Sequence, residues 1–128
     1  MHRLEVRLKQ HLPDPRGLGL VRDIHDLGIA TVSEVRVVDI YWLDAGLTPE
    51  NLELICRSLL ADPVTQEYRY EPGFSVEGEA GTNYHIIEVA YNAGVTDPIE
   101  DTIIKAVRDL GVSGVRAVKT ARQCGVCL

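Results

Sequence analysis

The sequence lacks long apolar runs, basic stretches and an even number of cysteines. No hydrophobic segment approaches the ~20 residues of a membrane-spanning helix, and the N-terminus shows no signal-peptide core. The formal charge is -6, with 13 basic and 19 acidic residues, whereas nucleic-acid binding depends on basic patches. Three cysteines form an odd set, which disfavours a disulfide framework. We expect a cytoplasmic protein that binds neither membranes nor nucleic acid.

Aromatic residues are also scarce, with one Trp, one Phe and five Tyr. The hydrophobic share of 45% and the charged share of 25% are nevertheless those of a globular domain. A chain of 128 residues is long enough to bury one core. That core should be aliphatic, and its many β-branched residues favour strands.

The first part of the chain has the pattern of a strand, a helix and a long strand. Residues 2–10 alternate apolar and charged side chains, which predicts a half-buried strand. Asp14 precedes a proline, as an N-cap does at a helix start, and Gly28 is placed to end that helix. Residues 33–43 predict a strand with a bulge at 38–39, where the alternation slips.

Further elements follow in the same style. Asp-Pro and Thr-Pro pairs predict helix starts, and glycines predict helix ends or loops. The predicted elements are a helix from Thr48 to residue 61, a strand at 64–71, a glycine-rich linker at 72–83, a strand at 84–91, a helix capped by Asp97 and ending at Leu110, and an extended segment at 115–122.

The second half of the sequence repeats the first with an offset of 83. The matches include the helix cap, the helix stop and a core position, namely Asp14/Asp97, Gly28/Gly111 and Val35/Val118. Nothing in the second copy corresponds to residues 48–71. We therefore expect a complete repeat at 1–71, a linker at 72–83 and a partial second repeat at 84–128.

The one sharp chemical signal is the C-x-x-C formed by Cys124 and Cys127. Redox pairs of this kind sit at a helix N-terminus, whereas this pair follows a predicted strand. A zinc site would need two more ligands, from Cys56 or the four scattered histidines. A structural role is the more economical interpretation, and the metal or redox alternative is tested by zinc analysis of the reduced protein.

Other candidate residues have ordinary structural interpretations. Gly17 and Gly19 resemble a dinucleotide loop, but Arg22 stands where its third glycine belongs. His25 has no nucleophile at workable spacing, and His11 has Gly94 at its repeat position, so that no paired site is implied. The carboxylates with solvated patterns are Glu50, Glu53, Glu77 and Glu79. We therefore predict no catalytic, cofactor-binding or metal-binding residue in this chain.

Several segments together resemble the PurS subunit of phosphoribosylformylglycinamidine (FGAM) synthase, an enzyme of purine biosynthesis. They are residues 6–9 with Asp14, Pro15 and Gly17, residues 35–37, residues 55–64, residues 67–71 and, in the second copy, residues 87–92 and 94–98. The Gly-Lys usual after the 35–37 strand is replaced by Val38 and Asp39, so no contact through that lysine is carried over to this chain. Two copies in tandem are similar to the N-terminal region of single-chain synthases, where the pair mimics a PurS dimer.

The resemblance implies an α+β fold, with tandem ferredoxin-like βαβ(β)αβ repeats, helices on one face of an antiparallel sheet, and an incomplete second repeat. It also implies a bridging role without chemistry, between a PurL-type synthase and a PurQ-type glutaminase, so that ammonia from glutamine reaches the amidating site. ATP, magnesium and glutamine would be used by those partners. The under-covered second repeat predicts that the isolated chain forms homo-oligomers.

One alternative of a different class is an amino-acid-binding regulatory module of the ACT type, which also uses tandem βαββαβ units. The glycine-containing turn usual after the first strand of such modules is replaced here by residues 12–15, Leu-Pro-Asp-Pro. Calorimetry with amino acids distinguishes the two classes.

Overall fold

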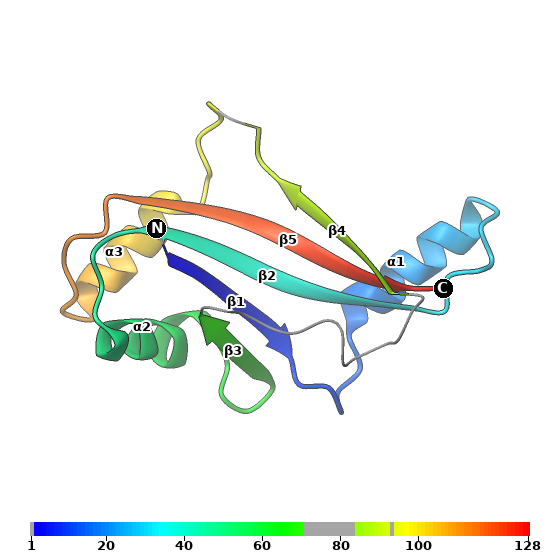
Figure 1. Ribbon diagram of the computed structural model, residues 1–128, viewed down its shortest axis with the longest axis horizontal. Coiled ribbons are helices and arrows are strands. Elements are labelled where there is room, and N and C mark those ends of the chain that lie inside the picture. The colour runs from blue at the N-terminus through cyan, green and yellow to red at the C-terminus, as the bar shows by residue number, and fades with distance from the viewer. Residues whose placement is uncertain (1, 71–83, 93) are drawn as a thin grey trace.

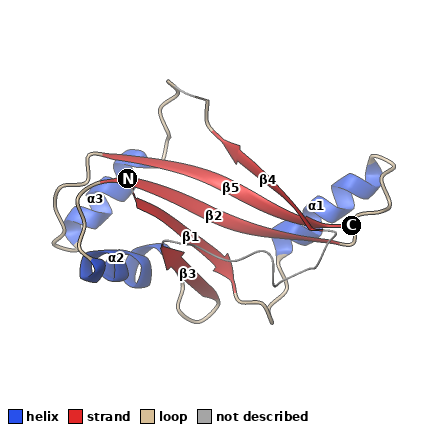
Figure 2. Cartoon of the chain, in the orientation of Figure 1, coloured by secondary structure: helices blue, strands red, loops and turns tan. Residues whose placement is uncertain are grey.

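The computed structural model describes residues 2–70, 84–92 and 94–128, so the predicted linker at 72–83 lies outside the described residues. A π-helical turn, Cys56–Leu60, directly extends the second helix. The helices and strands are β1 (His2–Leu8), α1 (Pro15–Asp26), β2 (Glu34–Asp44), α2 (Pro49–Ile55), β3 (Gln66–Tyr70), β4 (Tyr84–Ala90), α3 (Glu100–Asp109) and β5 (Ala117–Cys127) (Figure 1, Figure 2).

The strands form one antiparallel sheet in the order β3-β1-β2-β5-β4. α1 lies over one end of the long central strands, and α2 and α3 lie over the other end (Figure 1). Leu4 and Leu43 pack with α2 and α3, Val35 packs with α1, and strand alternation places all three side chains on one face. The fold is therefore α+β and ferredoxin-like, as the sequence predicts. In the described part of the chain, no helix is long and apolar enough to cross a membrane.

Several predicted elements differ at their ends. The first strand ends at Leu8 instead of residue 10. The strand predicted from residue 64 begins at Gln66, because Asp62 holds a turn before it, accepting from the N–H of Val64 at 2.9 Å and of Gln66 at 2.8 Å. The last extended segment, predicted at 115–122, begins at Ala117 and continues to Cys127, because β5 pairs with β2 over its whole length.

The same strand pairing occurs in both halves of the chain. Leu4 of β1 pairs with Tyr41 of β2, and Ile87 of β4 pairs with Cys124 of β5, so that both numbers rise by 83. The offset found in the sequence therefore also relates the two hydrogen-bonded ladders.

A local two-fold axis passes between β2 and β5 at Asp39 and Arg122. These two residues pair with each other and are also equivalent under the offset of 83. Pairing of a position with its own equivalent is the geometry at the centre of a symmetric antiparallel dimer. In this chain both halves of that arrangement belong to one polypeptide.

The predicted bulge at 38–39 is wrong. Pairing of β2 with β5 continues from Glu34 to Asp44 without an extra residue. The alternation slips because both faces of the strand are buried at its centre: Val37 lies under the helices, while Val38 and Ile40 are buried on the opposite face. Apolar residues at neighbouring positions then indicate two-sided burial.

Two buried aspartates connect the segments before α1 and α3 to the sheet. Asp14 caps α1 through the N–H of Gly17 (3.1 Å) and also accepts from the N–H of Val37 (2.8 Å). Asp97, its equivalent, accepts from the N–H (2.7 Å) and the hydroxyl (2.6 Å) of Thr120. Both N–H groups lie one residue beyond the last pair made by β1 or β4. Each carboxylate therefore accepts a backbone hydrogen bond at the position where β1 or β4 no longer pairs with its neighbour, so the N–H group is not left without a partner.

The predicted start of α3 directly after Asp97 is wrong by two residues, because the helix begins at Glu100. Asp97 accepts from the N–H of Ile99 (3.1 Å) and holds a non-helical turn there. The predicted glycine stops after α1 and α3 are confirmed. Gly28 and Gly111 follow α1 and α3 with φ values of 91° and 87°, the left-handed conformation that glycine tolerates.

The two helix starts differ because equivalent positions hold different side chains. A Cβ on Gly17 would lie 1.8 Å from the carbonyl oxygen of Val35, so α1 reaches the sheet only with glycine there. In the second copy this position is Glu100, whose carboxylate accepts from the N–H of Val118 at 2.9 Å. At the start of α1 the helix backbone packs directly against β2, whereas at the start of α3 the side chain of Glu100 lies between the helix and β5.

The core has one part at each end of the sheet. The larger part joins β1, β2 and β5 to α2 and α3, and its buried residues are Leu4, Leu43, Leu52, Ile55, Cys56, Ile103, Val107, Val112 and Val118. The smaller part contains Val32, Val35 and Val126, packed against α1. The larger part includes residues of α2 and of the π-helical turn that follows it, and among the described residues the smaller part has nothing equivalent to them.

Gly17→Ala should lower the free energy of unfolding by about 2 kcal/mol, because the new methyl group overlaps the backbone of Val35. Gly19→Ala is the matched control in the same helix, with nothing within 4 Å of the added Cβ. It should raise stability by about 0.5–1 kcal/mol. Urea midpoints measure both changes. Equal midpoints for the two variants would contradict this approach of α1 to the sheet.

Asp97→Asn should cost about 1.5–3 kcal/mol at neutral pH, because a carboxylate that accepts several hydrogen bonds is lost. Burial acts to raise the pKa of Asp97, but the bonds from Thr120 and Ile99 outweigh it and lower the pKa below 3.8. The carboxylate thus stabilises the fold above the unfolded-state value, and this contribution is lost as the pH falls through the lower folded-state value. The stability difference between wild type and variant, followed by urea unfolding across pH, should disappear in acid. Asp101→Asn, at an exposed acid in the first turn of α3, should change little.

Candidate functional site

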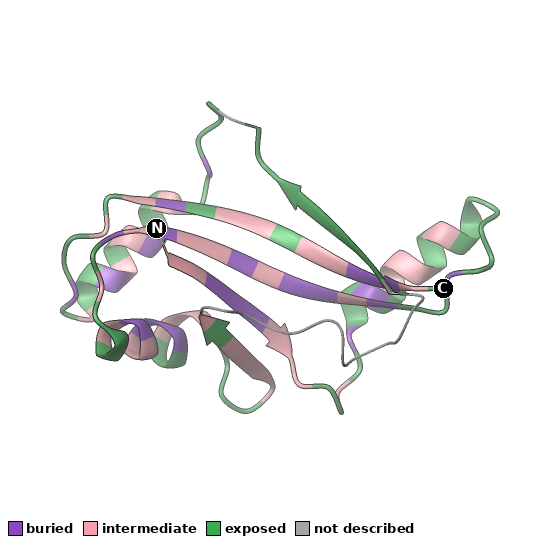
Figure 3. Ribbon diagram, viewed as in Figure 1, coloured by how far each residue is buried: buried purple, intermediate pink, exposed green. Residues whose placement is uncertain are grey.

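An apolar face over β4 is exposed at positions whose equivalents in the first half are buried. Leu4 is 0% exposed and its equivalent Ile87 is 54% exposed, while Val6 is 1% and Val89 is 60% exposed. Figure 3 shows the contrast: β4 is drawn as exposed from residue 85 onward, whereas β1 and β2 carry buried stretches. Contiguous exposed apolar surface of this kind is typical of an interaction site. We call it the β4 face and define it by Ile87, Val89 and Tyr91.

The β4 face is open because the described residues contain nothing equivalent to α2 and β3 beside it. β4 lies at one end of the sheet that the described strands form. Val112 is buried in the larger core at 4% exposure, whereas its equivalent after α1, Ile29, is 50% exposed. The α1 end of the molecule therefore resembles the α3 end, but nothing in the described residues covers it as α2 and β3 cover the α3 end.

A groove of about 640 Å³ adjoins the β4 face at the local two-fold axis. Leu20 of α1 and Tyr91 line it beside Asp39 and Arg122 on the central strands. Arg16 holds Asp39 through two hydrogen bonds of 2.9 and 3.0 Å, which raise the pKa of the guanidinium. Arg122 is exposed and makes no ion pair with any residue from the described ranges. The groove therefore combines apolar walls with one available cation.

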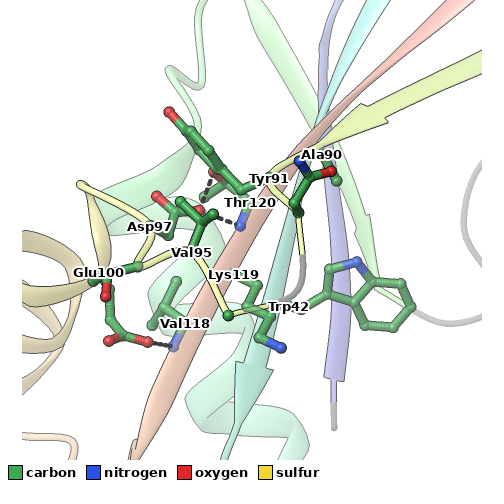
Figure 4. A pocket seen from close by; sticks show the side chains of 12 residues that line it. Trp42, Ala90, Tyr91, Val95, Asp97, Glu100, Val118, Lys119 and Thr120 are labelled. Carbon is green, nitrogen blue, oxygen red and sulfur yellow. Dashed lines mark hydrogen bonds between the residues drawn. The ribbon is translucent and has the colours of Figure 1, made fainter.

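A second pocket, of about 390 Å³, lies between the loop after β4 and the strand β5 (Figure 4). Both of its carboxylates bind the backbone: Asp97 holds Thr120, and Glu100 holds the N–H of Val118 (Figure 4). The lowered pKa of Asp97, in which hydrogen bonds outweigh burial, is opposite to the shift that a general acid needs. Its acidic groups thus serve the fold.

The three cysteines do not form a common site. Cys124 and Cys127 are three residues apart on β5, so their side chains point to opposite faces of the sheet. Cys56 is buried in the larger core, where burial and the charge of Glu53 raise its pKa to about 12. Burial also raises the pKa of Cys124, the reverse of thiol activation. The C-x-x-C residues therefore do not converge on one ligand.

Glu53 is not the solvated position that its pattern predicts. Its carboxylate accepts hydrogen bonds from the hydroxyls of Tyr68 and, at 3.2 Å, Tyr70, both on β3. The hydrogen bond from Tyr68, together with its burial, raises the pKa of that tyrosine to about 12. These bonds make α2 and β3 a single packed unit. Tyrosines at alternate positions of one strand are the sequence signal that could have indicated it.

The remaining candidates lie apart from one another. His25 is exposed on α1, with Nε2 2.8 Å from the carbonyl oxygen of Val32, and His11 is exposed in the loop after β1. Gly17 serves helix packing, Arg22 and Glu50 are exposed, and Glu77 and Glu79 lie outside the described residues. The structure therefore brings none of these side chains together with another candidate.

The face of the sheet opposite the helices carries ion pairs. Arg3 binds Glu5 at 3.1 Å and Glu88 of β4 at 3.3 Å, and Arg7 binds Glu67 at 2.7 Å. Charges of both signs are matched across the strands there. The β4 face, on the helix side, is thus the candidate functional site in the described part of the chain.

Two solved structures are similar to this chain. A PurS from B. subtilis is 27% identical, with a TM-score of 0.49, and covers 56% of this chain and 96% of its own. The PurS of Methanocaldococcus jannaschii, described as a subunit of formylglycinamide ribonucleotide amidotransferase in the purine biosynthetic pathway, is 26% identical, with a TM-score of 0.46, and covers 56% of this chain and 94% of its own.

None of the curated proteins compared with the chain matches it. The sequence model of the PurS family, described as phosphoribosylformylglycinamidine (FGAM) synthase, matches residues 2–72. That range exceeds half of the sequence and spans β1 to β3. The chain therefore belongs to the PurS family of FGAM synthase components.

Proposed function

We propose that the chain is a non-catalytic bridging component of FGAM synthase in de novo purine biosynthesis. It holds a PurL-type synthase subunit and a PurQ-type glutaminase together, so that ammonia released from glutamine reaches the ATP-dependent amidation of formylglycinamide ribonucleotide. ATP, magnesium and glutamine are bound by those partners. The observation that carries the proposal is the family match over residues 2–72.

The side-chain chemistry of the described residues supports a scaffold. The carboxylates nearest a pocket, Asp97 and Glu100, accept hydrogen bonds from backbone N–H groups. The thiol pKa values of Cys56 and Cys124 are raised mainly by burial, which leaves both as poor nucleophiles at neutral pH. Carboxylates and thiols that serve the fold are consistent with a protein whose role is to position other subunits.

The tandem arrangement suggests that one chain takes the place of two PurS subunits. β2 and β5 pair about the local two-fold axis at Asp39 and Arg122, as two copies of one strand would in a symmetric dimer. The three cysteines are free, which favours the reducing cytoplasm as the site of action. Without its partners, the chain is expected to self-associate through the β4 face.

Purified alone, the chain should show no ATPase, glutaminase or amidation activity. Mixed with PurL-type and PurQ-type subunits, it should be required for amidation with glutamine but not with ammonium salt, because free ammonia needs no bridge. The measurement is FGAM formation with each nitrogen source, with and without this chain.

Catalysis by the chain itself, surviving repurification and lost on a point substitution, would overturn the proposal. So would equal glutamine-dependent rates with and without the chain. Heat released on titration with amino acids, in the same preparation, would favour the ACT-type alternative.

A further inference from the structure

We propose that the β4 face binds a helix–strand segment of a partner protein, seated on β4 as α2 and β3 are seated on β1. The proposal deepens the proposed function, and it rests on that function only in assigning the segment to a synthase subunit. The chemistry of the segment follows from the first half of this chain.

The first half shows what the occupant does. Leu52 and Ile55 of α2 pack with Leu4 in the larger core. β3 then pairs antiparallel with β1, placing Tyr70 opposite Leu4. Glu53 ties the helix to the strand through Tyr68 and Tyr70. The occupant is therefore a short amphipathic helix followed by one strand, a combination of helix-in-groove and strand-addition binding.

The second half offers the matching receptor. Ile87 and Val89 stand at the positions of Leu4 and Val6 and pair with β5 in the register that β1 makes with β2. No strand of the described residues pairs with the outer edge of β4, and the proposed segment would pair there. Leu20 and Ile24 of α1 are only partly buried beside this surface. An added helix would cover them as α2 covers the equivalent residues of α3.

Charge gives the occupant its polarity. In the first half, Arg69 of β3 lies opposite Glu5 of β1. The equivalent of Glu5 is Glu88, so the register places a cation of the incoming strand opposite Glu88. Opposite charges at directly paired positions favour one register over its neighbours. Arg122 in the groove adds a site for a carboxylate of the helix.

A second copy of this chain fits the β4 face less well. Its own α2 and β3 already cover β1, so they are not free to cover a second strand. Two β4 edges could pair, but the layer above Ile87 and Val89 would stay empty of helices. Self-association should therefore be weaker than binding of a helix–strand segment, and such a segment should displace it.

A synthetic peptide with the sequence of residues 48–70 is the probe, because it carries the helix, the tyrosines and the cation. Added to the intact chain, it should bind with one-to-one stoichiometry by calorimetry. By sedimentation equilibrium it should convert any self-associated chain to a monomer carrying one peptide. Ile87→Glu should weaken peptide binding by about tenfold to a hundredfold, because a buried apolar contact is lost. Ile86→Glu is the matched control: it adds the same charge one residue away, on the opposite face and outside the expected pairing.

Charge exchange locates the peptide on β4. Glu88→Arg should weaken binding of the wild-type peptide, and a peptide carrying Arg69→Glu should recover it on that variant. Equal binding by both peptides to both proteins would overturn the register. No binding would overturn the proposal, and self-association that the peptide cannot displace would assign the face to a second copy. Peptide binding uses no synthase subunit, so its outcome is independent of the glutamine-dependence test.

Discussion

The pairing of β2 with β5 is the constraint on which the rest of the structure depends. It joins the two halves along strands of eleven residues each and fixes Asp39 opposite Arg122. Because side chains alternate across a strand, this single register decides which residues of both halves face the helices. A shift by one residue would place Val118 and Val126 of β5 on the opposite face from Val35 and Leu43 of β2. The two parts of the core exist only because this ladder is in place.

The two halves depart from symmetry at the local two-fold axis itself. Arg16 binds Asp39, whereas their equivalents are Ile99 and Arg122, which cannot form an ion pair. Within the chain, Asp39 of β2 lies opposite Arg122 of β5. If two copies of β2 paired in the same way, Asp39 would lie opposite Asp39, and like charges at paired positions are unfavourable. Opposite charges at the axis therefore favour pairing within the chain.

Local signals in the sequence predict much of this fold. The Asp14 cap, the Gly28 and Gly111 stops and the alternation of β1 each reflect a short-range requirement of the backbone. The failures have tertiary causes. The apparent bulge at 38–39 reflects burial on both faces, and the late start of α3 reflects Glu100 in place of a glycine. The contacts of Glu53 with β3 depend on a chain reversal, and the alternate tyrosines of that strand point to Glu53 only once the reversal is known.

The candidate site was visible in the sequence as an incomplete repeat, but its nature was not. An apolar alternation such as that of residues 84–91 predicts that one face of the strand is buried, and here that face is exposed. The difference between Ile87 and Leu4 lies in what packs on them, not in their own chemistry. A strand patterned for burial but left open is costly in water, and partner binding removes that cost. Under the proposed bridging role, the chain would gain stability and a fixed position from the same contact.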